Sequence, residues 1–433
     1  MRARIFRQFH PVGQGAFYTE HIFCNHEKFN VVYDCGSSTN KAIVKKQIRR
    51  TFKEGETIHA LFISHLHKDH INEIPFLIEY CQVKNIFFPL ISDVNKLILL
   101  KELNEQELNE QDYNFTYQFI SNPKNAINNL KNNCNVMPKL IAVHEVSSDN
   151  SPSDNDIPFD LEDDSNSQAN SEWQLFDQSI PSGRKLTYSR LKDIWEYIPF
   201  NFEQNIQKEK LEKILYESGI TVYNGQFMEG GVIIPPEEVI IKKKRAFNEI
   251  IGKTYDKISG KRNGNSMAVY SGRLSRISSI YDSIDLRMDD ERFFNDWINN
   301  EIFYLHYSRR FVNRYWSRRF VNRYWSRGKN PGCLYTGDYD ASTDTYFNAL
   351  KTHYEKYWST IGCFQVPHHG SECNFNTGFI ENDKVYIISA GTKNSYGHPN
   401  ADVIKSIHIG GGYPFVITED CSSYLAQTFC FDF

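Results

Sequence analysis

Apolar residues occur along this chain in short runs and in spaced patterns, and the two arrangements predict different elements. Short apolar runs at residues 31–33, 60–63 and 140–143 are typical of buried strands. Spaced apolar positions over residues 74–80 indicate a helix soon after the second of these strands. Further elements are expected as strands at 185–188 and 195–200 and as helices at 96–108, 125–134, 203–217 and 237–258.

One polar segment lies between the strand expected at residues 60–63 and the helix expected at 74–80. It contains His65, His67, Asp69 and His70 within six positions, in the order H-x-H-x-D-H. Two histidines on a turning loop can reach one cation together, and the Asp-His pair beyond them is directed at a second. Imidazole nitrogens and carboxylate oxygens are ligands that zinc and its neighbours favour. Chance seldom places four such side chains behind a strand, so this segment predicts a metal site.

Other motifs occur in the order found in one known family. They are Val-Gly-Gln-Gly-Ala-Phe at 12–17, Asp-Cys-Gly at 34–36, Thr-Gly-Asp at 336–338, His-His-Gly-Ser at 368–371 and Tyr-Gly-His-Pro at 396–399. Together with the H-x-H-x-D-H segment, these motifs resemble the metallo-β-lactamase fold superfamily. The last three are similar to one branch, which contains the hydrolase domain of the ComEC-type DNA-uptake proteins and the secreted phosphorylcholine esterases. The resemblance covers roughly residues 5–95 and 263–433.

The resemblance implies an α/β fold, α+β by some schemes, built as a four-layer αββα sandwich with large helical insertions. Residues 1–95 would form the first half of the core, and residues 263–433 the second half with a helical basic insertion at 275–330. Residues 96–262 would be an insertion that includes an acidic loop at 145–172. The core of this fold needs about 250 residues, so much of the chain must be insertion.

The resemblance also implies a role for each ligand-type residue in the H-x-H-x-D-H segment. His65 and His67 would bind one cation, and Asp69 and His70 would bind the second. Asp338 would bridge the two, because a carboxylate has two oxygens that can span cations ~3.5–4 Å apart. The cofactors would be two divalent metal ions, zinc or manganese. Asp69 is expected to be essential for catalysis.

Residues outside that segment would complete the site. His369 is expected to complete the second metal site, whereas His368 would contact the substrate or hold its partner by a hydrogen bond. His398 is expected to bind a phosphate or to give a proton to the leaving group, and the alternative is a turn histidine bonded to the backbone. Many relatives supply a third histidine to the first cation, and His144 is the candidate ligand here. Asp34 would orient a ligand histidine or the loop around it.

Composition limits where such a protein can work. The chain has 433 residues, of which 40% are hydrophobic, and a net charge of −4, so it can bury a large core. It contains no run of about 18 apolar residues and does not open on a secretory signal, which argues against a membrane span and against export. Nine cysteines without C-x-x-C spacing are typical of a reducing cytosol. We therefore expect a cytoplasmic protein that does not contact a membrane.

Three segments carry unusual charge. Residues 145–172 are acidic and contain no Lys or Arg, which favours a solvated loop over a nucleic-acid mimic that gates the site. Residues 242–262 are rich in Lys and Arg, and residues 308–325 repeat one nine-residue unit that combines arginine with Phe, Tyr and Trp. Such residues neutralise phosphates and stack on bases, so nucleic acid is an expected partner of both basic segments. A core-facing stripe of the aromatic residues explains the repeat equally well.

These observations predict a metal-dependent hydrolase in which two cations activate a hydroxide, acting as a phosphodiesterase and most readily as a nuclease. A hydrolase of a small phosphodiester, ester or lactone is the first alternative, and it leaves the basic segments without a role. The second alternative is a metal-binding subunit of a multi-protein complex, in which the insertions bind a protein partner.

Overall fold

The computed structural model describes the parts of the chain that form the core and the candidate site. These are residues 2–24, 27–92, 95–97, 99–100, 103, 110–130, 137–146, 158–162, 175–189, 191, 194–202, 213, 216–217, 219–223, 226–234, 266–273, 280–287 and 330–432. The basic segments 242–262 and 308–325 lie outside the described residues, as do most of the acidic segment 145–172 and most of the helices expected at 203–217 and 237–258. Their expected roles stay predictions.

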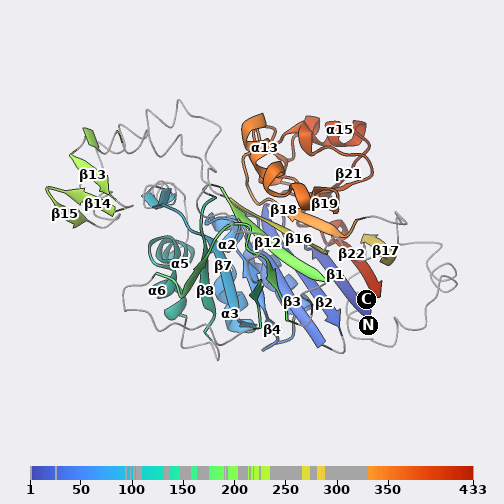
Figure 1. The fold of residues 1–433 in the computed structure, drawn as a ribbon, viewed down its shortest axis with the longest axis horizontal. Coiled ribbons are helices and arrows are strands. Elements are labelled where there is room, and N and C mark those ends of the chain that lie inside the picture. The colour runs from blue at the N-terminus through green and yellow to red at the C-terminus, as the bar shows by residue number, and fades with distance from the viewer. Residues whose placement is uncertain are drawn as a thin grey trace.

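The first of two large sheets has nine strands (Figure 1). Their order is β10 (Gln178–Ile180), β8 (Lys139–Val143), β7 (Asn85–Pro89), β5 (Ala60–Phe62), β3 (Glu27–Ser37), β2 (Gly15–Cys24), β1 (Arg2–Phe9), β22 (Leu425–Asp432) and β17 (Ile280–Arg287). The strands from β10 to β3 are parallel, and those from β3 to β17 are antiparallel. Because β1 pairs antiparallel with β22, both ends of the chain lie at one edge of the molecule (Figure 1).

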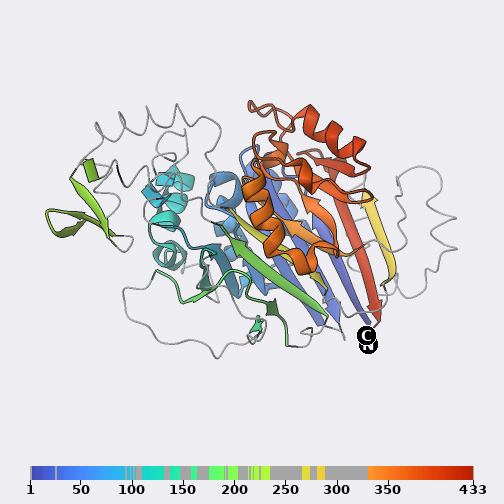
Figure 2. The same ribbon diagram turned by 45° about the horizontal axis from the view of Figure 1, so that its top comes forward.

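The second large sheet has eight strands. Their order is β21 (Tyr413–Ile417), β20 (Val385–Ser389), β19 (Ile361–Gln365), β18 (Gly332–Tyr335), β16 (Met267–Arg273), β12 (Trp195–Asn201), β11 (Leu186–Thr187) and β9 (Phe159–Asp160). The strands from β21 to β18 are parallel. Two small sheets pair β4 (Thr57–Ile58) with β6 (Gln82–Val83), and β13 (Ile220–Tyr223) with β14 (Gln226–Glu229) and β15 (Val232–Ile234). The three-stranded sheet lies apart from the large sheets in both views (Figures 1 and 2).

Helices cover the outer face of each large sheet and complete four layers (Figure 2). The described helices on the first sheet include α1 (Lys41–Thr51), α3 (Ile74–Tyr80), α5 (Glu110–Ser121) and α6 (Pro123–Asn128), and those on the second include α13 (Asp344–His353), α14 (Glu355–Trp358) and α15 (Ala401–Ile409). Three apolar clusters fill the three interfaces, one between the sheets and one under each helical layer. The expected αββα architecture is therefore confirmed. None of the described helices is both long enough and apolar enough to cross a membrane.

Two parts of the fold differ from what the sequence led us to expect. Residues 280–287, expected within a helical insertion, form the edge strand β17 and pair with β22. The prediction of helix is wrong there, and the alternation Ile-Asp-Leu-Arg at 284–287 has the period of two that strands show. The expected insertion 96–262 also supplies β8, β9, β10, β11 and β12 to the large sheets. The domain boundaries themselves stay a prediction.

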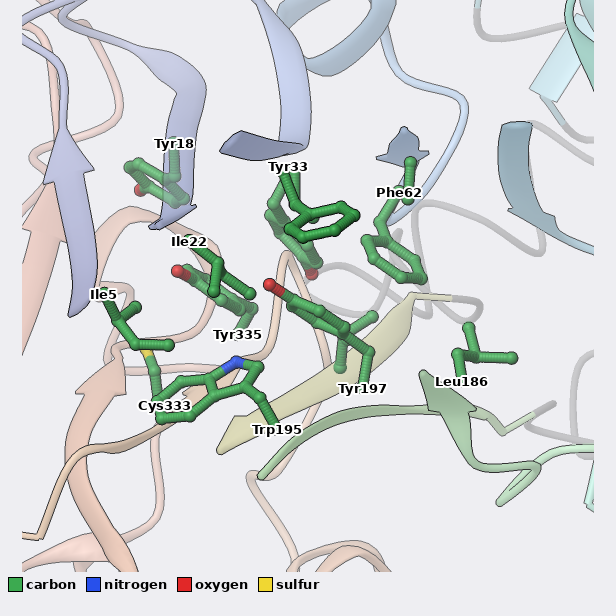
Figure 3. Packing of buried hydrophobic residues seen from close by; sticks show 14 of the residues in the cluster. Ile5, Tyr18, Ile22, Tyr33, Phe62, Leu186, Trp195, Tyr197, Cys333 and Tyr335 are labelled. Atoms are coloured by element: carbon green, nitrogen blue, oxygen red, sulfur yellow. The ribbon is translucent and has the colours of Figure 1, made fainter. Parts of the chain in front are cut away.

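A buried carboxylate joins the two sheets inside the sandwich. Glu20 on β2 accepts hydrogen bonds at Oε1 from Arg7 Nε at 2.6 Å and from the Tyr335 hydroxyl at 2.9 Å. Its Oε2 atom accepts bonds from the Tyr197 hydroxyl at 2.8 Å and from Ser271 Oγ at 2.7 Å. Tyr197 and Tyr335 point from the second sheet into the space between the sheets (Figure 3). One carboxylate therefore connects five strands, two from the first sheet and three from the second.

Candidate metal centre

The candidate ligands lie at the carboxyl ends of parallel strands. Strand β5 is followed by the loop at 63–67 and the short helix α2 (Lys68–Ile71), and the neighbouring β3 carries Asp34 near its end. In the second sheet, β18 is followed by Asp338, and β19 by the 3₁₀ turn η2 (His368–Gly370). Loops that follow parallel strands leave a sheet at the same edge, so residues far apart in the sequence meet there.

One group of potential ligands consists of His65, His67 and Asp338, whose ligand atoms lie within 4.8 Å of one another. The Nε2 atom of His65 is 3.4 Å from Oδ2 of Asp338, and the His67 ring packs edge-on against the His65 ring. The Nε2 atom of His368 lies 3.6 Å from the same carboxylate oxygen. Three imidazoles and one carboxylate are a donor set that suits a four-coordinate zinc ion.

A second group lies at the other oxygen of Asp338. Its Oδ1 atom is 3.5 Å from Nε2 of His70 and 3.9 Å from Nε2 of His369. Oδ2 of Asp69 lies 3.2 Å from Nε2 of His369 and 4.0 Å from Nε2 of His70. The ligand atoms of His70, Asp338 and His369 lie within 4.8 Å of one another, as do those of His65, Asp69 and His70. Asp338 therefore presents one oxygen to each of two groups of histidines.

Asp34 and Ser64 hold the histidines of the first motif. Nδ1 of His70 lies 2.7 Å from Oδ2 of Asp34. Ser64 donates its backbone N–H to Oδ1 of Asp34 and its hydroxyl to Oδ2, both at 2.7 Å, and its Oγ lies 2.9 Å from Nδ1 of His65. These contacts engage the Nδ1 atoms and leave the Nε2 atoms directed at the carboxylates, which is how partners of ligand histidines set the ring orientation. Asp34 therefore orients the ring of the candidate ligand His70.

The His-His pair is held by a different set of contacts. His369 Nδ1 lies 2.8 Å from the carbonyl oxygen of Ser389, and His368 Nδ1 lies 2.7 Å from Oδ1 of Asn374. Both histidines have left-handed backbone conformations, with φ of 47° at His368 and 55° at His369. Side chains other than glycine rarely adopt such angles, and these strained positions cluster at functional sites. The turn directs neighbouring histidines to opposite oxygens of Asp338.

Burial and charge set the protonation of this cluster. Burial, assisted by His70, lowers the pKa of His65 to about 3 against the opposing effect of Asp338. Burial would also lower the pKa of His70, but the carboxylates of Asp34 and Asp69 outweigh it and raise that pKa to about 10. Burial would raise the pKa values of Asp69 and Asp338, but nearby histidines hold both below their usual range.

The buried Nε2 atoms of His65 and His70 make no hydrogen bond of normal geometry within the described part of the chain. Unsatisfied nitrogens beside ionised carboxylates fit divalent cations, which would displace the proton held at His70. The residues present therefore suit two metal ions, with Asp338 between them.

His398 lies beside the first group. Its ring centroid is 5.3 Å from that of His368, and its side chain is half-buried. Burial, with the charges of His368 and His369, lowers its pKa to about 4, so its imidazole is neutral near pH 7. Asn394 bonds both the backbone N–H and the carbonyl oxygen of His398, which holds the turn without using the ring. The expected role of the ring in binding phosphate or in proton transfer stays a prediction.

His144 follows β8 and belongs to none of the three ligand groups found among the described residues. Its backbone N–H bonds the carbonyl oxygen of Ile180, and its own carbonyl oxygen accepts the Ser182 hydroxyl. Its role as a ligand stays a prediction. The third imidazole that the described structure brings to Asp338 Oδ2, beside His65 and His67, is His368.

Sequence analysis missed several residues that shape the site. Ser64 adjoins the metal motif, and its position there was the one available signal. Ser266 Oγ accepts the backbone N–H of Asp338, and Gln365 Oε1 accepts those of Thr336 and Gly337. Ser266 and Gln365 gave no such signal, because the residues that they hold are distant in sequence.

Comparison with known families agrees with this geometry. Residues 22–92 match the sequence model of the metallo-β-lactamase superfamily, a family composed mostly of hydrolytic metalloenzymes. The matched segment runs from β2 to just beyond β7 and contains the whole H-x-H-x-D-H motif. No curated protein matches the chain significantly.

Proposed function

We propose that this protein is a metal-dependent phosphodiesterase that uses two divalent cations, zinc or manganese, to hydrolyse nucleic acid. The observation that carries the proposal is the placement of Asp338, whose two carboxylate oxygens face two separate groups of histidines. A carboxylate shared in this way is the arrangement expected of a bridging ligand in a two-metal hydrolase.

Each residue of the site has a defined task in this proposal. His65, His67 and His368 would hold one cation, and the remaining set of Asp69, His70 and His369 would hold the other. When bound, the cations supply a hydroxide near neutral pH and stabilise charge on the phosphoryl and leaving oxygens.

The protein's own contribution to catalysis is orientation. The Nδ1 contacts of His70, His368 and His369 keep the Nε2 atoms in place before any ligand arrives. With a pKa of about 4, the neutral His398 ring can donate one N–H to a phosphate oxygen at pH 7. This favours a phosphate-binding role for His398 over transfer of its own proton.

Three features support a phosphodiester as substrate. The Thr-Gly-Asp, His-His-Gly-Ser and Tyr-Gly-His-Pro motifs resemble the ComEC-type branch, whose hydrolase domain is linked to DNA uptake. Residues 242–262 are dense in Lys and Arg, and residues 308–325 combine arginine with aromatic residues. Both features are typical of proteins that bind nucleic acid. A small diester as the only substrate would leave these segments without a role.

The test is cleavage of labelled single- and double-stranded DNA and RNA and of a small chromogenic phosphodiester, with manganese, zinc or chelator. We expect metal-dependent cleavage that is lost in Asp69→Ala and retained in Asp402→Ala, a matched change at an exposed residue of α15. Elemental analysis should find two metal ions per chain in the parent and fewer in Asp69→Ala.

Turnover of the small diester alone would replace the nuclease by a small-molecule hydrolase. A well-folded, metal-loaded protein that cleaves none of these substrates would refute the proposal and favour a metal-binding subunit.

A further inference from the structure

Helix α1 carries a concentration of positive charge that the metal centre does not use. Its sequence, Lys-Ala-Ile-Val-Lys-Lys-Gln-Ile-Arg-Arg-Thr, contains five basic residues and no acidic one. The helix buries Val44, Gln47, Ile48 and Thr51 against the first sheet. Lys41, Lys45 and Arg49 recur every four residues and therefore form one row on the helix surface, about 12 Å long at a rise of about 1.5 Å per residue.

Part of this row is anchored by neighbouring groups. The ammonium nitrogens of Lys41 and Lys45 lie 3.9 and 3.8 Å from carboxylate oxygens of the buried Glu73. One carboxylate therefore faces two cations, and a net positive charge remains. Lys45 Nζ and the Arg49 guanidinium lie 5.2 and 4.8 Å from the centre of the Phe76 ring, within the range of cation–π attraction.

The row begins beside the metal centre. Lys41 and Lys45 both lie against Glu73, which follows the candidate ligand His70 by three residues. Lys68 is the first residue of α2 and stands directly before the candidate ligands Asp69 and His70. The segment that carries these candidate ligands and Lys68 therefore packs, through Glu73, against the row on α1.

Aromatic rings accompany this charge. The rings of Phe76 and Tyr80 on α3 stack on each other with centroids 5.7 Å apart, and both are only partly buried. Basic side chains interleaved with partly exposed rings are the pattern by which proteins bind single-stranded nucleic acid, because cations track the phosphates and rings stack on bases. An ordinary solvated helix face would more often mix charges of both signs.

We propose that Lys68, Lys41, Lys45 and Arg49, with Phe76, form a track that binds the backbone of a single-stranded nucleic acid leading to the metal centre. The track rests on the proposed function, since it deepens the substrate of the same site. It lies wholly within described residues and is independent of the basic segments 242–262 and 308–325.

The experiment measures binding of a short labelled single strand to the full chain by fluorescence anisotropy over a range of salt concentrations, with metal and with chelator. The test variant is Lys45→Gln/Arg49→Gln, because glutamine removes the charge and keeps helix propensity. The matched control is Lys351→Gln/Lys356→Gln in the other helical layer, where Lys351 likewise lies 5.5 Å from the Trp358 ring. Thermal unfolding establishes that each variant is folded.

We expect the test variant to bind the single strand at least about tenfold more weakly at low salt. The slope of the logarithm of the association constant against the logarithm of salt concentration should become less steep by about 1.4, which corresponds to two phosphate contacts on a single strand. The control should bind as the parent does. An equal loss in test and control would show non-specific attraction and overturn the track, as would unchanged affinity in the test variant. Sedimentation with anionic lipid vesicles is measured on the same proteins. If the test variant keeps its binding to nucleic acid and loses binding to the vesicles, the track is overturned and the row binds a membrane surface.

Binding needs no hydrolysis, so the two proposals can fail separately. A protein that cleaves single strands but shows equal affinity in parent and test variant refutes the track alone. A protein that binds single strands through the row but cleaves nothing refutes the proposed catalysis and leaves the track in place.

Discussion

Replacement of Glu20 by glutamine tests how the two sheets are held together. Glu20 is 2% exposed and Arg7 is fully buried, so their contact is shielded from solvent. Arg7 and Glu20 are joined by Tyr335, Tyr197 and Ser271, all of which donate to the carboxylate. Glutamine has nearly the same shape, but it removes the negative charge and turns one acceptor oxygen into an NH2 group that faces donors.

The magnitude follows from the buried charge that remains. Removing one partner of a buried ion pair destabilises a protein by about 3–5 kcal/mol, because the other charge stays in a low-dielectric interior. Arg7 keeps contacts with the carbonyl oxygen of Pro331 and with Gln427 Oε1, but neither of these carries a charge. We therefore expect Glu20→Gln to lower the free energy of unfolding by about 3–5 kcal/mol.

Urea unfolding followed by tryptophan fluorescence measures this loss, since the buried Trp195 donates to Ser271 within the same network. In an Arg7→Met background, Glu20→Gln leaves no buried cation without its partner. The change at Glu20 should therefore lower the free energy of unfolding by about 2 kcal/mol less than it does in the parent. Equal losses in both backgrounds would refute the ion-pair explanation. A loss below about 1 kcal/mol in the parent would refute the claim that this carboxylate holds the sheets.

Two further predictions concern pH and backbone strain. Burial lowers the pKa of His10 and of His21 well below 6.5, so both stay neutral in the folded state while the unfolded chain takes up protons. The contribution of these two histidines to the free energy of unfolding is then fully present above about pH 6.5. Below that pH the contribution falls by about 2.7 kcal/mol per pH unit for the two histidines together. Unfolding at several pH values should show a shallower slope in His10→Gln/His21→Gln, and an unchanged slope would contradict the assignment. Gly337 has φ of +54°, and an added Cβ would lie 2.5 Å from Ser64 Cβ, so Gly337→Ala should displace Asp338 and reduce the metal content found by elemental analysis. The control is Gly55→Ala, because Gly55 has φ of +74° and open space around it. This variant carries backbone strain of about 1 kcal/mol and should retain the metal. Equal metal content in the two variants would contradict the argument.

Much of the candidate metal centre could be predicted because half of its side chains lie in one short segment. His65, His67, Asp69 and His70 lie within six positions between a strand and a helix, so local chain geometry alone brings them together. The strand expected at 60–63 and the helix expected at 74–80 follow from their apolar patterns, and they are confirmed as β5 (Ala60–Phe62) and α3 (Ile74–Tyr80). By contrast, the strand at 280–287 depends on pairing with β22, and its weak alternation did not outweigh the expectation of helix.

The motifs and their spacing indicated which side chains could bind metal, and their resemblance to the metallo-β-lactamase fold implied the αββα architecture. Tertiary packing sets how these side chains are shared: His368 and His369 are adjacent in sequence, yet the packed sheets direct them to different oxygens of Asp338. The same packing places Glu20 opposite the second sheet, and no local sequence pattern predicts this contact. The physical reason is that periodicity and spacing act over one turn or one strand. Contacts between residues that are hundreds of positions apart depend on how whole sheets pack face to face. Such contacts form only in the folded chain, so no local pattern predicts them.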